Sequence, residues 1–141
     1  MRPGRFEITL KVFLVDGDRM LVLRDRESRQ GDLPGGRLGA DEMAEPWMDA
    51  VSRELREELG PNARWRVDPE PLFVWPHQFT STGLDGLGIA FAGVWEGGRL
   101  TLSDEHEAFA WIPVDGTDMA DWFAGTMLQA AGRFQQRPRS G

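Results

Sequence analysis

The chain has 141 residues, of which 40% are hydrophobic and 28% are charged, and its net charge is −7. This length predicts one domain that buries roughly two thirds of the surface of the unfolded chain. The acidic balance, without a basic stripe, argues against binding to long nucleic acid.

The sequence does not predict a membrane-spanning segment or a secretory signal. No apolar run approaches the roughly 18 residues that cross a membrane, and residues 1–7 lack the apolar core of a secretory signal. Cysteine is absent, which excludes disulfides and thiol chemistry. We therefore expect a cytoplasmic protein that does not bind membranes.

The first part of the chain predicts a hairpin followed by a glycine-rich turn. Residues 7–15 predict a strand, because Ile8, Leu10, Val12 and Leu14 alternate onto one face. Asp16-Gly17 predicts a tight turn into a second strand at 20–24. A polar loop then leads to Leu33-Pro34-Gly35-Gly36.

A mid-chain helix is predicted from Pro46 to Leu59, with Gly60 as its C-terminal cap. Apolar residues at helical spacing predict a second helix from near Thr117. Between the helices we expect strands at 64–67, 71–75, 78–80, 87–95, 99–102 and 111–113, and a turn at 83–86. This order predicts an α+β fold or an α/β/α sandwich. Residues 1–134 form the single domain, and residues 135–141 are expected to be a flexible tail.

Three carboxylates converge near the end of the mid-chain helix. Glu54, Glu57 and Glu58 lie within an arc of about 100°. Glu54 and Glu58 repel each other at i,i+4, and the last turn of a helix favours cations rather than acids. A helix that breaks such local rules is a candidate functional site, and converging carboxylates indicate a hard divalent cation. The alternative is a solvated acidic face without a ligand.

Together with upstream residues, this acidic turn forms a longer pattern, Gly-x5-Glu-x7-Arg-Glu-apolar-x-Glu-Glu-x-Gly. Its positions are filled by Gly39, Glu45, Arg53, Glu54, Leu55, Glu57, Glu58 and Gly60. The pattern closely resembles the Nudix box of the Nudix hydrolase family, and its many fixed positions make a chance match rare. The resemblance implies a mixed β-sheet between the box helix and a C-terminal helix.

Two positions depart from the family pattern. In the family the opening glycine is usually the second of a Pro-Gly-Gly turn, but here Pro34-Gly35-Gly36 lies three residues before Gly39. We interpret this as a three-residue insertion among residues 37–43, with Gly36 as the structural glycine. The position after Gly60 is usually aliphatic and is here Pro61.

The resemblance implies hydrolysis of a nucleoside diphosphate linked to another moiety. Water attacks a phosphorus, while Mg²⁺ or Mn²⁺ offsets the diphosphate charge and lowers the pKa of the water. Glu54 and Glu58 are the implied core metal ligands, and Glu57 completes the cluster. The backbone carbonyl of Gly36 is a further candidate, and Glu45 is a weaker one that acts through water.

The resemblance also implies a catalytic set made of Glu54, Glu57, Arg53 and Glu105. Arg53 is expected to orient one of the glutamates. Residues 102–107 resemble the late loop of many family members, where an acidic residue precedes a strand that begins with tryptophan, and Glu105 is the expected general base. Asp104 and Glu107 are alternatives for this role, and a loop without chemistry is another. His106 is expected to be a surface residue or a helper.

The substrate is less constrained by the sequence. Arg24 and Arg37 are candidate phosphate contacts, and Trp47 and Trp75 could stack on a base, although solvated arginines and core tryptophans are the alternatives. We favour a small nucleotide, a nucleoside triphosphate or modified nucleotide that releases a monophosphate. ADP-ribose, a nucleotide sugar or a dinucleoside polyphosphate are alternatives, as is a nucleotide-sensing module without activity. We expect a monomer or a homodimer.

Overall fold

The computed structural model describes residues 1–78 and 85–138. In chain order, the elements of these ranges are β1 (Glu7–Asp16), β2 (Arg19–Asp25), β3 (Gly31–Asp32), β4 (Gly35–Arg37), α1 (Trp47–Leu59), β5 (Ala63–Val67), β6 (Phe73–Gln78), β7 (Asp85–Gly98), β8 (His106–Pro113), the 3-10 helix η1 (Met119–Asp121) and α2 (Gly125–Gln136). No helix within these ranges is long and apolar enough to span a lipid bilayer.

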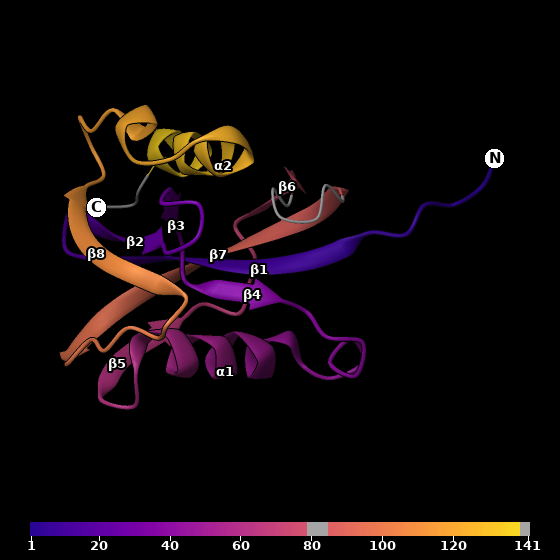
Figure 1. The fold of residues 1–141 in the computed structure, drawn as a ribbon, viewed down its shortest axis with the longest axis horizontal. Helices are drawn as coiled ribbons and strands as arrows, with labels where there is room; N and C mark the ends of the chain where they lie inside the picture. Colours follow the sequence, from indigo (N-terminus) through magenta and orange to yellow (C-terminus); the bar gives the residue numbers. More distant parts are fainter. Residues whose placement is uncertain (79–84, 139–141) are drawn as a thin grey trace.

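The strands form one mixed sheet between two helices. Its main order is β3-β2-β1-β7-β5, and in addition β4 pairs with β1, β6 with β7, and β8 with β2. Strands β1 and β7 are parallel, whereas the other pairs are antiparallel. Helix α1 covers one face and α2 the other (Figure 1). The predicted α+β fold, an α/β/α sandwich, is confirmed.

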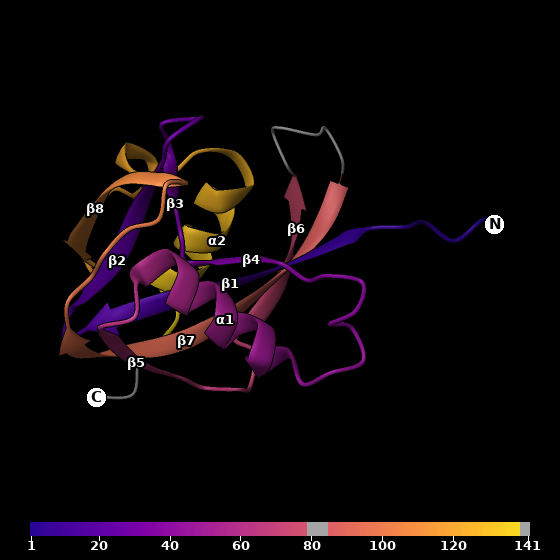
Figure 2. The same ribbon diagram turned by 60° about the horizontal axis from the view of Figure 1, so that its bottom comes forward.

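Strands β1 and β2 separate just beyond the hairpin that joins them. They pair only where Val15 and Asp16 face Met20 and Arg19. Farther along, residues 9–11 of β1 pair with β4, whereas residues 23–24 of β2 pair with β3. The segment from β3 to β4 therefore lies between two diverging strands (Figure 2). This opening in the sheet is where the candidate site forms.

The two faces of β1 pack against different helices, because side chains alternate along a strand. Leu10, Val12 and Leu14 belong to the hydrophobic core beneath α1. Phe13 belongs to the core beneath α2, where its ring stacks on Phe134 with 4.2 Å between centroids. The predicted apolar face of β1 therefore packs under α1, while Phe13 and Val15 give the opposite face an apolar part that the prediction did not include.

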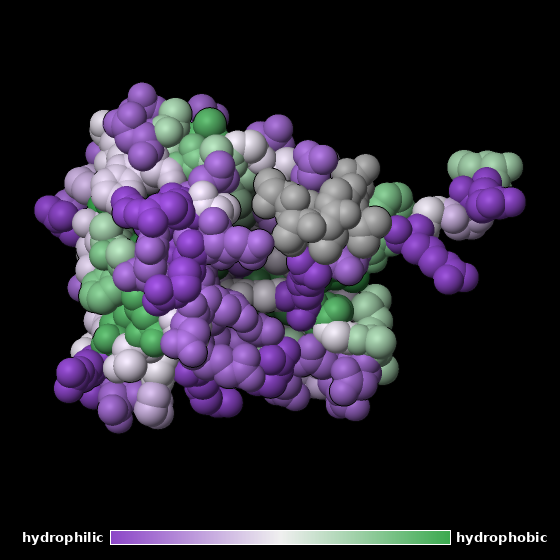
Figure 3. All heavy atoms as spheres, in the orientation of Figure 1, coloured by the Kyte–Doolittle hydropathy of each residue, from purple (hydrophilic) through white to green (hydrophobic). Residues whose placement is uncertain are grey.

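Helix α1 begins one residue after the predicted start and ends at the predicted residue, Leu59. It buries Val51, Leu55 and Leu59 against the sheet, while its outer surface is hydrophilic (Figure 3). Gly60 ends the helix with a φ of +92°, a conformation that disfavours other residues, and its N–H donates to the carbonyl of Arg56.

Two predicted elements disagree with the structure. Residues 99–102 are not a strand, because backbone N–H groups of Arg99 and Thr101 donate to Asn62 and Leu59 across a loop. The C-terminal helix does not begin near Thr117, since Gly125 takes a φ of +58° and redirects the chain before α2.

Other boundaries shift slightly. Helix α2 continues to Gln136, so the first two residues of the expected tail are helical, and the Gln135 side chain donates to the carbonyls of Val114 and Thr117. The strand predicted at 78–80 and the turn at 83–86 lie largely outside the described residues.

Replacing Leu55 by alanine should lower the free energy of unfolding by about 2–5 kcal/mol, because this fully buried side chain leaves a cavity beneath α1. Denaturant unfolding followed by circular dichroism measures the change. Arg56→Lys, on the exposed side of the same helix, should change stability by less than about 0.5 kcal/mol. Equal stabilities of the two variants would contradict the described packing.

Candidate active site

The two glycines of the predicted glycine turn begin β4, and each is required for a different reason. Gly35 has a φ of +138°, and a Cβ on it would overlap the carbonyl oxygen of Leu10. A Cβ on Gly36 would lie 2.5 Å from Cδ of Glu54. The turn can therefore approach both β1 and α1 only because it has no side chains here.

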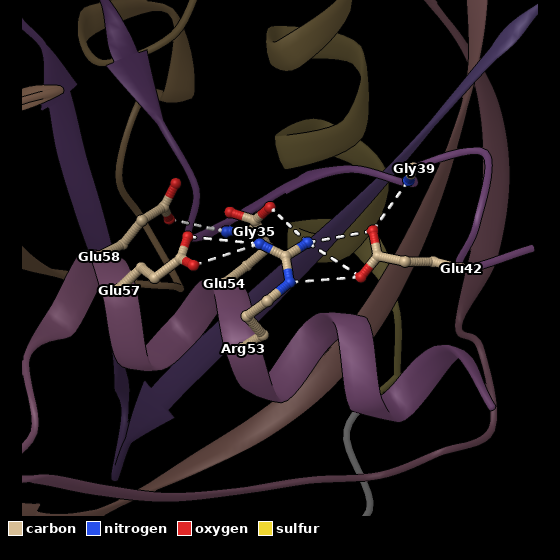
Figure 4. Close-up of polar contacts among 7 residues, drawn as sticks. All are labelled: Gly35, Gly39, Glu42, Arg53, Glu54, Glu57 and Glu58. Carbon is tan, nitrogen blue, oxygen red and sulfur yellow. Dashed lines mark hydrogen bonds and ion pairs between the residues drawn. The ribbon is translucent and has the colours of Figure 1, made fainter. Parts of the chain in front are cut away.

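Glu58 is the most buried carboxylate of the site, with 4% exposure. Its Oε2 accepts the backbone N–H of Gly35 at 2.9 Å (Figure 4). Burial raises the pKa of Glu58 to about 7, although nearby Lys11 and the bond from Gly35 favour the ionised form. Near neutral pH, Glu58 is therefore poised between its acid and carboxylate forms.

Arg53 contacts three glutamates (Figure 4). Its Nη2 lies 3.0 Å from Oε2 of Glu42 and 3.1 Å from Oε1 of Glu54, and its Nη1 lies 3.3 Å from Oε1 of Glu57. Burial raises the pKa of Glu54, while Arg53 lowers it. The Glu57 side chain is 58% exposed, against 17% for Glu54, so Glu57 lies farther from the buried end of the cluster.

The position expected for Glu45 is occupied instead by Glu42. Glu42 forms the paired bonds with Arg53 and also accepts the N–H of Gly39, whereas Glu45 is exposed and does not line the pocket described below. Glu42 follows Gly36 at the Gly-x5-Glu spacing. The three extra residues therefore lie between Glu42 and Arg53, not among residues 37–43. The Gly-x5-Glu spacing alone does not distinguish the two glutamates, because Glu42 follows Gly36 and Glu45 follows Gly39 at the same separation.

A second polar cluster lies beneath the glycine turn and was not anticipated from the sequence. We call it the Lys11–Asp32–His106 cluster. Lys11 Nζ donates to Asp32 Oδ1 at 2.9 Å, and His106 Nε2 lies 3.1 Å from Asp32 Oδ2. Lys11 is 7% exposed and His106 2%, so of the two roles expected for His106 the surface position is wrong and that of a helper stays a prediction. The sequence offered one sign of this cluster: Lys11 is the only lysine of the chain, and it lies in a largely apolar strand.

The charges of this cluster support one another. Burial disfavours the charge of Lys11, but Asp32 and Glu58 outweigh that effect and raise the pKa of Lys11. Burial also opposes ionisation of Asp32, yet Lys11 and His106 hold the pKa of Asp32 well below its usual range. Burial likewise opposes the charge of His106, and the bond to Asp32 outweighs it and raises the pKa of His106.

The loop before β8 brings Glu105 to the same place. The ligand atoms of Glu58, Glu105 and His106 lie within 4.8 Å of one another, and the charge of Glu105 adds to the rise in the pKa of Glu54 that begins with burial. Glu105 lines the pocket, whereas Asp104 and Glu107 are not among its lining residues.

A pocket of about 760 Å³ runs from this cluster to the N-terminal end of α2. At that far end, Thr126 Oγ1 accepts the backbone N–H of Gln78 at 3.2 Å and lies 2.8 Å from Nδ1 of His77. Burial lowers the pKa of His77 to about 4, so this side chain is neutral near pH 7, whereas Glu54, Glu58 and Glu105 line the other end of the pocket. The volume suits a small-molecule ligand.

Of the four residues predicted to contact the substrate, only Arg37 lines the pocket. Arg37 lines the pocket and lies 3.4 Å from Glu7 through its Nη1, whereas Arg24 is exposed and is not a lining residue. Trp47 packs on the core beneath α1, with its Nε1 donating to Met43. Trp75 is 2% exposed in the core beneath α2, because strand alternation turns it inward with Phe73. Stacking of a ligand on either tryptophan is therefore not supported.

The donor set fits a hard divalent cation. Glu58 and Glu105 place carboxylate oxygens within 4.8 Å of each other. Glu54 lines the same pocket and lies against Gly36. Oxygen donors of this kind suit Mg²⁺ or Mn²⁺. A cation would also offset the repulsion between Glu54 and Glu105 that disfavours their charged forms.

Comparisons with known proteins agree with this geometry. A family model described as the NUDIX domain matches residues 6–130. A NUDIX family hydrolase from Clostridium perfringens superimposes with a TM-score of 0.73 at 14% identity, covering 94% of this chain and 97% of that one. A MutT NUDIX hydrolase from Burkholderia pseudomallei gives a TM-score of 0.67 at 24% identity, with coverages of 91% and 96%.

A third similar structure is the E. coli dihydroneopterin triphosphate pyrophosphohydrolase, with a TM-score of 0.66 at 16% identity and coverages of 93% and 97%. At these identities the likeness shows a shared fold. No curated protein sequence matches this chain.

Gly36→Ala should weaken Mn²⁺ binding by roughly tenfold or more, because the added Cβ displaces the Glu54 carboxylate. Isothermal titration calorimetry with MnCl₂ measures the affinity. Gly132→Ala is the matched control, since a Cβ there meets no atom within 4 Å, and it should leave Mn²⁺ affinity unchanged. Wild-type affinity in Gly36→Ala would remove Glu54 from the ligand set.

Mn²⁺ affinity should also rise with pH and level off above about 7, because protons compete for Glu58 below that pH. In the cation-free protein, the raised pKa of Glu58 has the opposite effect on stability: its contribution is full below about pH 4.5 and is lost as the pH rises through about 7. Calorimetry and thermal unfolding across this range measure both trends. Glu58→Gln should flatten both trends, and unchanged slopes in that variant would assign the proton to another group.

Proposed function

This chain belongs to the NUDIX family of hydrolases, and we propose that it is a pyrophosphohydrolase acting on a nucleoside diphosphate linked to another moiety. The observation that carries this proposal is the convergence of Glu54, Glu58 and Glu105 at one end of a pocket of about 760 Å³. The acidic end is suited to a cation-bound diphosphate, and the end lined by His77, Gln78 and Thr126 is suited to the rest of a nucleotide.

The residues proposed to hold the cation are Glu54 and Glu58, with the carbonyl of Gly36 and the more exposed Glu57 as additional donors. When bound, Mg²⁺ or Mn²⁺ would neutralise the diphosphate oxygens and lower the pKa of the attacking water. Glu54 and Glu58 project from a rigid helix, so little conformational entropy is lost when they bind. Arg53 keeps Glu54 in place through its Nη2 and Glu57 through its Nη1.

Glu105 is proposed as the general base. It lines the pocket opposite α1 and lies within reach of the same ligand as Glu58. In this role its carboxylate takes a proton from water as the oxygen attacks phosphorus, which requires a carboxylate near the cation but free to accept a proton. Arg37, which lines the pocket, is proposed to contact a substrate phosphate.

For the substrate we favour a nucleoside triphosphate or a modified nucleotide that releases a monophosphate. One protein of similar fold is named for its action on dihydroneopterin triphosphate, which is consistent with a triphosphate as ligand. A pocket of about 760 Å³ accommodates a single nucleotide. ADP-ribose and nucleotide sugars remain the alternatives that a substrate panel separates.

The decisive experiment incubates the protein and Mg²⁺ with nucleoside triphosphates, nucleotide sugars, ADP-ribose and dinucleoside polyphosphates, and identifies products by mass. Glu58→Gln should lower turnover by at least about two orders of magnitude, because it removes a proposed cation ligand. Glu70→Gln, an exposed change outside the pocket, is the control and should retain wild-type turnover. Full activity of Glu58→Gln would refute the site, and binding without any product would favour a nucleotide-sensing module.

A further inference from the structure

The Lys11–Asp32–His106 cluster connects three strands around the opening in the sheet. Lys11 belongs to β1, whereas Asp32 in β3 and His106, which directly follows Glu105 at the start of β8, belong to strands that both pair with β2. Strands β1 and β2 pair only at their hairpin end. The bond from Lys11 to Asp32 at 2.9 Å therefore spans the opening, and the bond from Asp32 to His106 at 3.1 Å joins the two strands that flank β2.

One side of the cluster leads to the glycine turn. Asp32 Oδ1 also accepts the backbone N–H of Leu33 at 2.8 Å, and Lys11 Nζ donates to the carbonyl of Leu33 at 3.1 Å. Two residues later, the N–H of Gly35 binds Glu58. The cluster thus determines where the turn lies relative to the carboxylates of α1.

The other side leads to the loop that carries Glu105. On its exposed flank, Arg26 anchors the backbone of this loop: its N–H donates to the carbonyl of Glu105 at 2.9 Å, and its Nε donates to the carbonyl of Asp104 at 2.8 Å. On the buried flank, the side chain of His106 anchors the loop to Asp32. Glu105 stands between these two anchors.

Packing alone does not account for this histidine. His106 is 2% exposed, and its Nδ1 has no hydrogen-bond partner among the described residues. A buried polar atom without a partner costs stability, and buried ionic groups can often be replaced by apolar side chains without loss. What an apolar residue could not supply is the directed bond to Asp32.

We propose that His106 is a positioning residue, which through its bond to Asp32 fixes the loop so that Glu105 faces Glu54 and Glu58. The proposal rests on the proposed function because it assigns the catalytic proton transfer to Glu105. It adds that the two sides of the site, the glycine turn and the Glu105 loop, are held in register by one partly buried carboxylate, that of Asp32.

The first test is kinetic, with the nucleotide that the wild-type enzyme cleaves fastest. His106→Leu keeps the site filled but removes the bond, and should lower kcat roughly 10- to 100-fold with little change in KM. His106→Gln can still donate to Asp32 and should restore most of kcat. Phe109→Leu, on an exposed part of β8, is the matched control and should match wild type.

A double-mutant cycle separates positioning from general destabilisation. In a Glu105→Gln background, His106→Leu should have little further effect on kcat, because the carboxylate that it positions is already absent. A full additional loss in that background, or an unchanged kcat in His106→Leu alone, would overturn the proposal. If His106→Leu does not fold, His106→Asn, whose side chain is too short to reach Asp32, replaces it in the cycle.

The second test needs no substrate and therefore remains decisive if the proposed function fails. The Arg26 amide bonds the carbonyl of Glu105, so its hydrogen-exchange protection reports the order of this loop. His106→Leu should lower that protection by about tenfold or more, and His106→Gln should preserve it. Because Lys11 is the only lysine, labelled lysine gives one NMR signal that reports whether the rest of the cluster is intact. Unchanged Arg26 protection with an intact Lys11 signal would refute the positioning role.

Discussion

The bond between Lys11 and Asp32 is the interaction on which the candidate site depends. Strands β1 and β2 separate beyond their hairpin, which exposes backbone groups that a closed sheet would pair. Strands β3 and β4 satisfy those groups on the two sides, and the ion pair between the buried Lys11 and the partly buried Asp32 joins the sides at 2.9 Å. Removing one partner of such a pair typically costs about 3–5 kcal/mol, because the other charge is left buried and unpaired.

The opening also concentrates negative charge. Glu54 and Glu58 reach it from α1, and Glu105 reaches it from the loop before β8. Burial raises the pKa of Glu58 to about 7 and also raises that of Glu54, so the carboxylates are held in an environment that their charge does not favour. Lys11 and Arg53 reduce this cost without removing it. Such strain is expected where a cation completes the site.

Local sequence patterns predicted the regular elements, but they failed where hydrogen bonds between residues distant in sequence determine the structure. Alternation predicted the face of β1 that packs under α1, and apolar periodicity with Gly60 predicted α1 to within one residue. The strand expected at 99–102 failed because those backbone groups bond to Asn62 and Leu59 in a loop. The spacing from Gly39 predicts Glu45, whereas the same spacing from Gly36 leads to Glu42, and only the contacts of Arg53 distinguish them.

The sequence by itself determined the family, the sandwich fold and the acidic helix turn, because each is encoded in residues close together along the chain. Tertiary structure alone decided which of these carboxylates are buried, that Trp75 is core, and that Asp32 joins Lys11 to His106. Asp32 is 21 residues from Lys11 and 74 from His106, so no local spacing relates them. Their meeting depends on two strands that separate, a property of the whole sheet.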